Sequence, residues 1–216
     1  MLEKEFISWV EEQLEAKIFI EKEVHGDQSD VFRIKTSNEN YFLKIAPDLK
    51  REQEKLKWLN GKLPVPKIVG FTEINNKNVL LLSALPGKNL KVLKKEWSGE
   101  KTVEKLVQVL KKIHAVDVKD CPFGEIGANN VLVHGDACLP NFVFDGETFS
   151  GYIDLGDMSI GDLEIDFCAA VWSLQYNLGK GFGLKFLEKY GVENANEELV
   201  EKLRLQYEHI QKEWGL

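Results

Sequence analysis

The chain of 216 residues is long enough to bury a core, in one large domain or in two small lobes. Its 28 Lys and Arg residues against 35 Asp and Glu residues give a net charge of −7, which excludes a basic face for nucleic acid and a polybasic tail for anionic lipid. Three cysteines without a CxxC pair argue against a disulfide framework or a zinc site. With no signal-peptide pattern and no apolar run of membrane-spanning length, we expect a cytoplasmic protein that does not enter a membrane.

The first part of the chain, residues 1–85, reads as a small antiparallel sheet with helices. Alternating apolar residues predict the strands, and apolar residues at helical spacing predict the helices. The expected elements are a helix over 2–15, strands over 31–35 and 41–46, a helix over 48–59, and two strands around the Asn75-Asn76 turn.

The second part, residues 86–216, begins at the pair Pro86-Gly87 and is mainly helical. Helices are expected over 103–114, 161–176, 181–190 and 197–214. A β-rich first lobe followed by a helical second lobe predicts the α+β class. A ligand site is expected between two such lobes.

Between the helices lies the segment "VLVHGDACLPNFVFDGETFSGYIDLGD", in which acidic and amide residues stand beside short apolar strands. The pair Asp145-Gly146 is a strong hairpin-turn signal, and two strands of similar length bring Asp154 back beside Asn141. Two oxygen ligands and a nearby carboxylate, Asp136, suit Mg²⁺ held largely by phosphate oxygens. For phosphoryl transfer, Asp136 would accept the proton of a substrate hydroxyl. The alternative is a plain hairpin flanked by loop residues.

A second pattern concerns one charged residue of the 48–59 helix. Leu49, Glu52, Leu56 and Leu59 fall at i, i+3, i+7 and i+10, so Glu52 lies within the apolar stripe of the helix. An inward carboxylate is costly unless it is paired, and Lys44 is the obvious partner. The alternative is a boundary glutamate that reaches solvent.

The motif "HGDACLPN…GYIDLGD" resembles that of the aminoglycoside phosphotransferases, especially the 3′-hydroxyl class, which is related to the catalytic loop and DFG motif of protein kinases. Further segments in the same order, including "YFLKIA", "LLLSALPGKNL" and "GDLEIDFCAAVWSL", extend the resemblance over most of residues 24–175. The resemblance implies a two-lobed protein-kinase-like fold, with a nucleotide-covering lobe over 1–85 and a lobe with the catalytic loop and acceptor site over 86–216. It also implies ATP or GTP, Mg²⁺, an aminoglycoside acceptor and a role in antibiotic resistance.

The resemblance further assigns nucleotide-binding residues. Ser29, in the turn "HGDQSD", matches the phosphate-covering turn, and Phe42 matches a position that stacks on adenine in relatives. Ser83 and Leu85 match the joint whose backbone groups contact the purine edge. Without the resemblance, the turn around Ser29 reads as an ordinary strand-to-strand turn and Phe42 as a core aromatic.

An acceptor with several amines needs carboxylates around it. The candidates are Asp157, Asp162, Glu164 and Glu208, which could equally form a solvated acidic surface. Asp157 departs from the family pattern, which often has a basic residue at that position. The resemblance also makes Asp162, together with Asp166, a brace for the catalytic loop.

The spacing around the motif departs from the family as well. His114 and His134 are 20 positions apart, and "GEIGANN" replaces a helical insertion that forms one wall of the sugar site in 3′-type enzymes. Two other readings therefore stay open: a kinase of another metabolite, such as choline, a sugar or an amino acid, and a nucleotide-binding relative with little turnover. A thiol hydrolase that uses Cys138 with His134 is a fourth reading.

Overall fold

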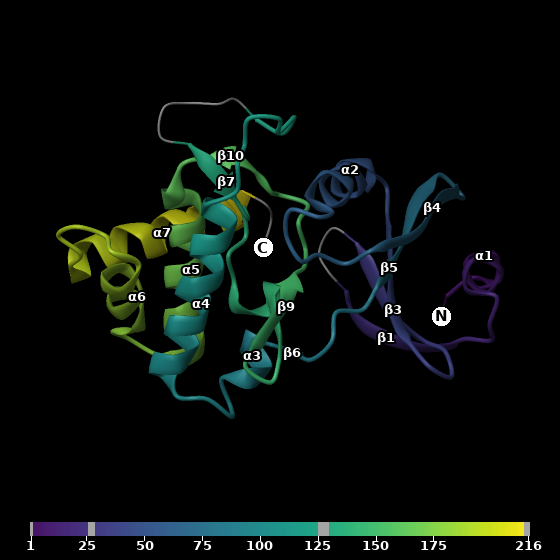
Figure 1. The fold of residues 1–216 in the computed structure, drawn as a ribbon, viewed down its shortest axis with the longest axis horizontal. Helices are drawn as coiled ribbons and strands as arrows, with labels where there is room; N and C mark the ends of the chain where they lie inside the picture. Colours follow the sequence, from purple (N-terminus) through teal and green to yellow (C-terminus); the bar gives the residue numbers. More distant parts are fainter. Residues whose placement is uncertain (1, 26–28, 125–129, 214–216) are drawn as a thin grey trace. The chain divides into compact units, whose positions relative to one another are not determined.

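The computed structural model describes residues 2–25, 29–124 and 130–213. The chain divides into two compact units, Met1–Leu85 and Pro86–Leu216 (Figure 1). An antiparallel sheet dominates the first unit and helices dominate the second, which confirms the predicted α+β class. In the part of the chain that the structure describes, no helix is long and apolar enough to cross a membrane.

The first unit contains a five-stranded antiparallel sheet in the order β1-β2-β3-β5-β4. Its elements are α1 (Lys4–Leu14), β1 (Phe19–His25), β2 (Asp30–Lys35), β3 (Asn40–Ala46), α2 (Lys50–Leu59), β4 (Ile68–Ile74) and β5 (Lys77–Ser83).

Each face of this sheet has its own set of side chains, because alternate residues of a strand point to opposite sides. Leu43 and Ile45 of β3 belong to an apolar core that also contains Phe6 and Val10 of α1. Lys44 lies between them in the strand and therefore points to the opposite face. Burial of apolar side chains against α1 thus fixes the register that directs Lys44 away from α1.

In its described residues, the second unit is built mainly from four helices, α4 to α7, and two small sheets, one of two strands and one of three. Its elements are β6 (Lys88–Asn89), α3 (Leu90–Leu93), α4 (Gly99–His114), β7 (Val131–Val133), the 3₁₀ helix η1 (Leu139–Asn141), β8 (Phe142–Asp145), β9 (Thr148–Tyr152), β10 (Ser159–Gly161), α5 (Leu163–Leu178), α6 (Phe182–Tyr190) and α7 (Glu197–Glu213).

Helix α5 is the centre of this unit, in contact with α4, α6 and α7 (Figure 1). Its sequence is apolar on most sides, as expected for a helix surrounded by others. Residues 166–171 of this helix are all buried. The helix therefore offers a rigid support for whatever its first turn contacts.

Strand β7 pairs with β10 over three residues and leads directly into the loop that carries Asp136. The hairpin β8–β9 follows η1 and is joined at its outer side by β6. These strands were expected over 142–144 and 149–153, and β8 and β9 begin and end within one residue of those positions. The turn Asp145-Gly146 lies between them as expected.

Some elements differ from the expectation. β1, β6, α3 and β10 were not predicted. Of these, β6 and β10 are strands of two and three residues whose pairing depends on partners remote in the sequence. Helix α4 begins four residues earlier than expected, where the Ser98 side chain accepts a hydrogen bond from the Lys101 N–H at 3.2 Å. The helix expected to start at 161 starts at Leu163, because Gly161 pairs with Val131 in the β7–β10 ladder.

Candidate active site

The loop after β7 is held by a buried carboxylate at the start of α5. Asp166 is fully buried and accepts hydrogen bonds from the backbone N–H groups of His134 (2.8 Å) and Gly135 (2.9 Å). It also accepts one from Nε2 of His114 at 2.9 Å. Three donors offset the cost of burying one carboxylate. Asp166 therefore braces the loop, as the resemblance implied.

Gly135 joins this loop to the segment after β9. Its φ of +87° lies in the left-handed region, and a Cβ at this position would lie 2.4 Å from the backbone oxygen of Asp157. Only glycine satisfies both conditions without a shift of the backbone. The close approach fixes the segment around Asp157 beside the loop that carries Asp136.

Asp136 has a hydrogen-bond donor on each carboxylate oxygen. The Asn141 amide nitrogen donates to Oδ2 at 2.8 Å and to the backbone oxygen of Asp136 at 2.9 Å. The Tyr207 phenol, from α7, donates to Oδ1 at 2.7 Å. The carboxylate is therefore fixed in orientation from both sides, as a general base requires.

Asn141 and Asp154 come together through the backbone of the hairpin. The Ile153 N–H donates to the Asn141 backbone oxygen at 3.0 Å, directly after the pairing of Phe142 with Tyr152. Asp154 therefore comes directly after Ile153, the residue that lies opposite Asn141. Its φ of +58° is left-handed, a conformation that costs energy for a residue other than glycine and that often marks a functional position.

These two side chains suit a magnesium ion. Both hydrogens of the Asn141 amide are used on Asp136, so its amide oxygen remains as a ligand with no donor among the described residues. Asp154 is exposed and supplies a carboxylate. Mg²⁺ typically takes one or two such protein oxygens and completes its shell with phosphate oxygens and water. Among the described residues, no group of three or more His, Cys, Asp or Glu side chains is arranged to hold a metal.

His134 is a structural residue in this arrangement. Its Nε2 lies 3.1 Å from the Ile153 carbonyl oxygen, which can only accept, and its Nδ1 accepts from the Asp136 N–H at 3.4 Å. The neutral Nε2–H tautomer satisfies both contacts. With both nitrogens engaged on the backbone, His134 is not placed to act as a base.

Cys138 does not form a catalytic pair with His134. Its thiol contacts the Ala169 carbonyl oxygen at 3.8 Å and the Tyr207 hydroxyl at 3.3 Å. Burial, and then the charge of Asp136, raise the pKa of this thiol well above its ordinary value. A thiolate is therefore disfavoured, and the geometry gives the thiol-hydrolase reading no support.

In the first unit, Lys44 and Glu52 form the ion pair that the helix periodicity indicated. The Lys44 ammonium lies 2.8 Å from both carboxylate oxygens of Glu52, and Glu52 is 6% exposed. The pair joins β3 to α2 on the sheet face opposite α1. Two well-placed hydrogen bonds compensate the loss of water around both charges.

The other expected nucleotide residues also lie in the first unit. Phe42 is half-buried on β3 between Arg33 of β2 and Leu82 of β5. Ser83 ends β5, where its N–H donates to the Lys67 carbonyl and its hydroxyl accepts from the Lys67 N–H, both at 2.9 Å.

Leu85 is half-buried at the end of the unit, and Ser29 is half-buried just before β2. The remainder of the expected phosphate turn, including Gly26, lies outside the described residues, as does most of "GEIGANN". The nucleotide roles of these residues remain predictions.

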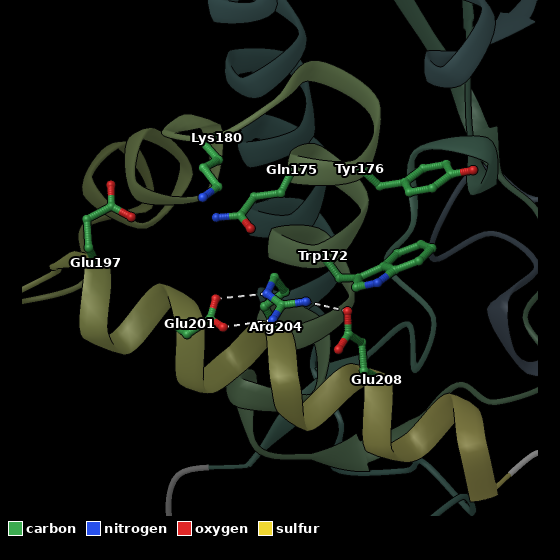
Figure 2. Close-up of a pocket in the computed structure, with 8 residues that line it drawn as sticks. All are labelled: Trp172, Gln175, Tyr176, Lys180, Glu197, Glu201, Arg204 and Glu208. Atoms are coloured by element: carbon green, nitrogen blue, oxygen red, sulfur yellow. Dashed lines mark hydrogen bonds and ion pairs between the residues drawn. The ribbon is translucent and has the colours of Figure 1, made fainter.

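A pocket of about 460 Å³ opens beside α5 and α7 (Figure 2). Trp172 and Tyr176 form its aromatic side, with parallel rings whose centroids are 5.1 Å apart. Arg204 binds Glu201 at 2.7 Å and also pairs with Glu208, which raises the pKa of its guanidinium and keeps it charged. The lining residues are Trp172, Gln175, Tyr176, Lys180, Glu197, Glu201, Arg204 and Glu208.

Of the four expected acceptor carboxylates, Glu208 lines this pocket and the other three do not. Asp162 accepts from the Glu164 N–H at 2.8 Å as the N-cap of α5, and Glu164 pairs with Lys202 at 3.0 Å. Asp157 is exposed beside Gly135. The geometry thus gives Asp162 a capping role where the resemblance implied a brace.

Tyr207 is the residue of this site that the sequence did not reveal. It follows Val200 and Leu203 at i+7 and i+4, and this spacing indicates a buried residue of an amphipathic helix. No local pattern indicates that its hydroxyl contacts Asp136, 71 positions earlier.

The comparisons with known proteins identify the family. Residues 21–131 and 125–203 match the model of the phosphotransferase enzyme family (APH), and the chain belongs to this family. A curated relative, the aminoglycoside 3′-phosphotransferase of Niallia circulans, is 30% identical over 208 residues, which cover 74% of this chain and 79% of that protein.

Solved structures show the same fold at lower identity. An aminoglycoside-3′-phosphotransferase of type VIII has a TM-score of 0.70 at 21% identity, with 86% of this chain and 92% of that chain covered. The ternary complex of streptomycin, ATP and APH(2″)-IIa has a TM-score of 0.69 at 19% identity, with 100% and 95% covered. These likenesses confirm the predicted fold, with an N-terminal antiparallel sheet and a helical C-terminal part.

Proposed function

We propose that this phosphotransferase transfers the γ-phosphoryl group of ATP, or of GTP, to a hydroxyl of a small molecule, and that an aminoglycoside is the acceptor. The observation that carries the proposal is the Asp136–Asn141 pair. One amide orients the candidate base through two hydrogen bonds and keeps its oxygen for a metal ion. The aminoglycoside 3′-phosphotransferase of Niallia circulans supports the choice of acceptor.

In the proposed reaction, Asp136 orients the acceptor hydroxyl and takes its proton as the oxygen attacks the γ-phosphorus. Asn141 and Asp154 hold Mg²⁺, which when bound neutralises charge on the phosphate oxygens. Lys44, held by Glu52, contacts the phosphates of the nucleotide. Positioning and electrostatic stabilisation supply most of the rate, because phosphoryl transfer needs little covalent chemistry from the protein.

The nucleotide is proposed to lie against the remaining residues of the first unit. Ser29 would contact the phosphates and Phe42 would stack on the base. The N–H and the hydroxyl of Ser83 are already hydrogen-bonded to the Lys67 backbone. The carbonyl oxygen of Ser83 and the N–H of Leu85 are therefore the groups proposed to contact the purine edge. Buried free thiols at Cys121, Cys138 and Cys168 agree with a protein of the reducing cytoplasm.

The pocket beside α5 and α7 is the proposed acceptor site. Trp172, which forms part of its wall, also packs against Tyr207 with ring centroids 5.3 Å apart, and Tyr207 touches Asp136. Trp172 and Tyr207 thus connect the wall of the pocket with the candidate base. Its aromatic side suits the face of a sugar ring, and Glu197 and Glu208 can bind amines.

One observation favours a second candidate, a kinase of a less cationic metabolite such as choline, a sugar or an amino acid. Three carboxylates and two cationic side chains line the pocket, so only one negative charge is in excess. Arg204 already binds two of the three carboxylates. A polycationic aminoglycoside would have to compete with Arg204 for them.

The two candidates are separated by incubating the protein with Mg²⁺ and γ-labelled ATP against a panel of aminoglycosides, choline, sugars and amino acids. Mass spectrometry then identifies any product that carries a phosphoryl group. A phosphorylated aminoglycoside supports the first proposal, and a product only from another metabolite supports the second. Nucleotide binding without transfer to any acceptor would favour a relative with little turnover.

A further inference from the structure

The contact between Tyr207 and Asp136 joins the C-terminal helix to the candidate base. The Tyr207 side chain is 4% exposed, and its hydroxyl lies 2.7 Å from Oδ1 of Asp136 and 3.3 Å from the Cys138 sulfur. Burial, and then the neighbouring Cys138 and Asp136, raise the pKa of the phenol. The phenol therefore stays protonated and acts as the donor.

The position of this hydroxyl matters because a base must accept a hydrogen bond from the hydroxyl that it activates. Asn141, within the same loop, already donates to Oδ2 of Asp136. Each carboxylate oxygen can accept more than one hydrogen bond, but the Tyr207 phenol already lies against Oδ1, the oxygen that Asn141 does not contact. A nucleophile that approaches Asp136 meets a hydroxyl already in place.

Competition for Oδ1 affects different nucleophiles unequally. Water that displaces the phenol replaces one hydrogen bond to a charged group by another and gains no further contact. An acceptor held in the pocket beside α5 and α7 has binding energy from its remote parts to offset the loss. Trp172, which packs on both Tyr176 and Tyr207, connects occupation of that pocket with the position of the phenol.

We propose that Tyr207 influences which nucleophile reaches the base: its phenol lies against Oδ1 of Asp136, competes with water there, and gives way to a hydroxyl of an acceptor bound in the pocket. The inference rests on the proposed phosphotransferase function. In the competing reaction, the water oxygen would bond to the γ-phosphorus, the bond to the β,γ-bridging oxygen would break to release ADP, and the proton would pass to Asp136. Tyr207 thus limits hydrolysis of ATP in the absence of acceptor.

The test uses the whole chain with Mg²⁺ and ATP alone and measures release of inorganic phosphate. Tyr207→Phe keeps the ring that packs on Trp172 and removes only the hydroxyl. Because a hydrogen bond to a charged group is lost, hydrolysis is expected to rise about tenfold. Tyr207→Met, a second variant without a hydroxyl, is expected to change in the same direction.

Two controls link the effect to the base. Tyr41→Phe removes a phenol hydroxyl that binds Glu39 on the first unit and is expected to leave hydrolysis unchanged. The double variant Tyr207→Phe/Asp136→Asn is expected to lose the gain, because the water no longer has a base.

An unchanged or slower hydrolysis in folded Tyr207→Phe overturns the inference; a slower rate would make Tyr207 a support for Asp136. Thermal unfolding and nucleotide binding establish that each variant is folded. The proposed function fails on a different observation, namely that the parent protein phosphorylates none of the acceptors in the panel.

Discussion

The two units of the molecule stabilise their buried charges in different ways. In the first, Glu52 meets an opposite charge, Lys44, eight positions away in the chain. In the second, the half-buried Asp136 and the fully buried Asp166 are bound largely by neutral donors, some from elements 31 to 71 positions away. The first arrangement ties one strand to one helix, whereas the second ties the loop of Asp136 to α5 and α7 and, through Asp166, to α4.

This difference predicts where substitutions cost most. A carboxylate with several backbone donors leaves each of them unsatisfied when it is removed, whereas an ion pair leaves one unpaired charge. The second unit is therefore expected to be more sensitive to loss of a single buried acid than the first. Equilibrium unfolding of variants from both units measures this difference.

The largest effect is expected for Asp166→Ala. The substitution removes the acceptor of two backbone N–H groups and of the His114 ring in a fully buried site. We expect a loss of about 4 kcal/mol in the free energy of unfolding. Asp162→Ala, which removes only the N-cap of the same helix, is the matched control and should cost about 1 kcal/mol. Equal losses would contradict the bracing role of Asp166.

The second effect concerns the ion pair of the first unit. Lys44→Met removes the ammonium that donates to both carboxylate oxygens of the buried Glu52 and should cost about 3 kcal/mol. Replacing both residues, in Lys44→Met/Glu52→Leu, removes the buried carboxylate as well and should cost less than Lys44→Met alone. A double-mutant cycle by urea unfolding measures the coupling. Additive losses would show that the two charges do not stabilise one another.

The same contrast explains which parts of the site were predictable from the sequence. The Lys44–Glu52 contact leaves a local signal, because a glutamate within an apolar stripe needs a nearby cation. The β8–β9 hairpin also leaves one, through its Asp145-Gly146 turn. The donors of Asp136 and Asp166 leave none, because the position of α7 and α5 against the loop depends on packing of the whole unit.

The fold shows the same limit. Long amphipathic helices and strands beside tight turns were predicted to within a few residues, since their periodicity is local. The short strands β6 and β10 pair with β8 and β7 over long sequence separations, and two or three residues carry no periodic signal. Tyr207 was similarly recognisable as a helix residue but not as a partner of the base.

A third effect is a pH dependence of the free energy of unfolding, which we expect from the buried thiol of Cys168 on α5 of the second unit. Burial, and then Glu164, raise the pKa of Cys168 from its ordinary value of 9.0 to about 12. The folded chain thus holds the Cys168 proton more tightly than the unfolded chain. The contribution of this thiol to the free energy of unfolding is therefore complete below pH 9 and decreases as the pH rises toward 12. Between pH 8 and pH 10 the parent should lose about 1 kcal/mol more than Cys168→Ala. Parallel pH profiles of the two proteins would be contrary to this expectation.

The smallest change in stability is expected at Asp154. Asp154→Asn keeps a residue that tolerates a left-handed backbone, so the free energy of unfolding should change by less than about 0.5 kcal/mol. Mg²⁺-dependent binding of ATP should nevertheless weaken, because a carboxylate ligand is lost. Calorimetric titration with and without Mg²⁺ measures this. Unchanged Mg²⁺ dependence would remove Asp154 from the metal site.

We propose above all that Asp136, oriented by Asn141, is the base of a phosphoryl transfer. The most direct measurement compares the rate of γ-phosphoryl transfer to the preferred acceptor in the parent and in Asp136→Asn, with ATP affinity measured in parallel. We expect the rate to fall by about 10²- to 10⁴-fold while ATP affinity stays nearly unchanged. Transfer at the parent rate by the folded variant would contradict the claim.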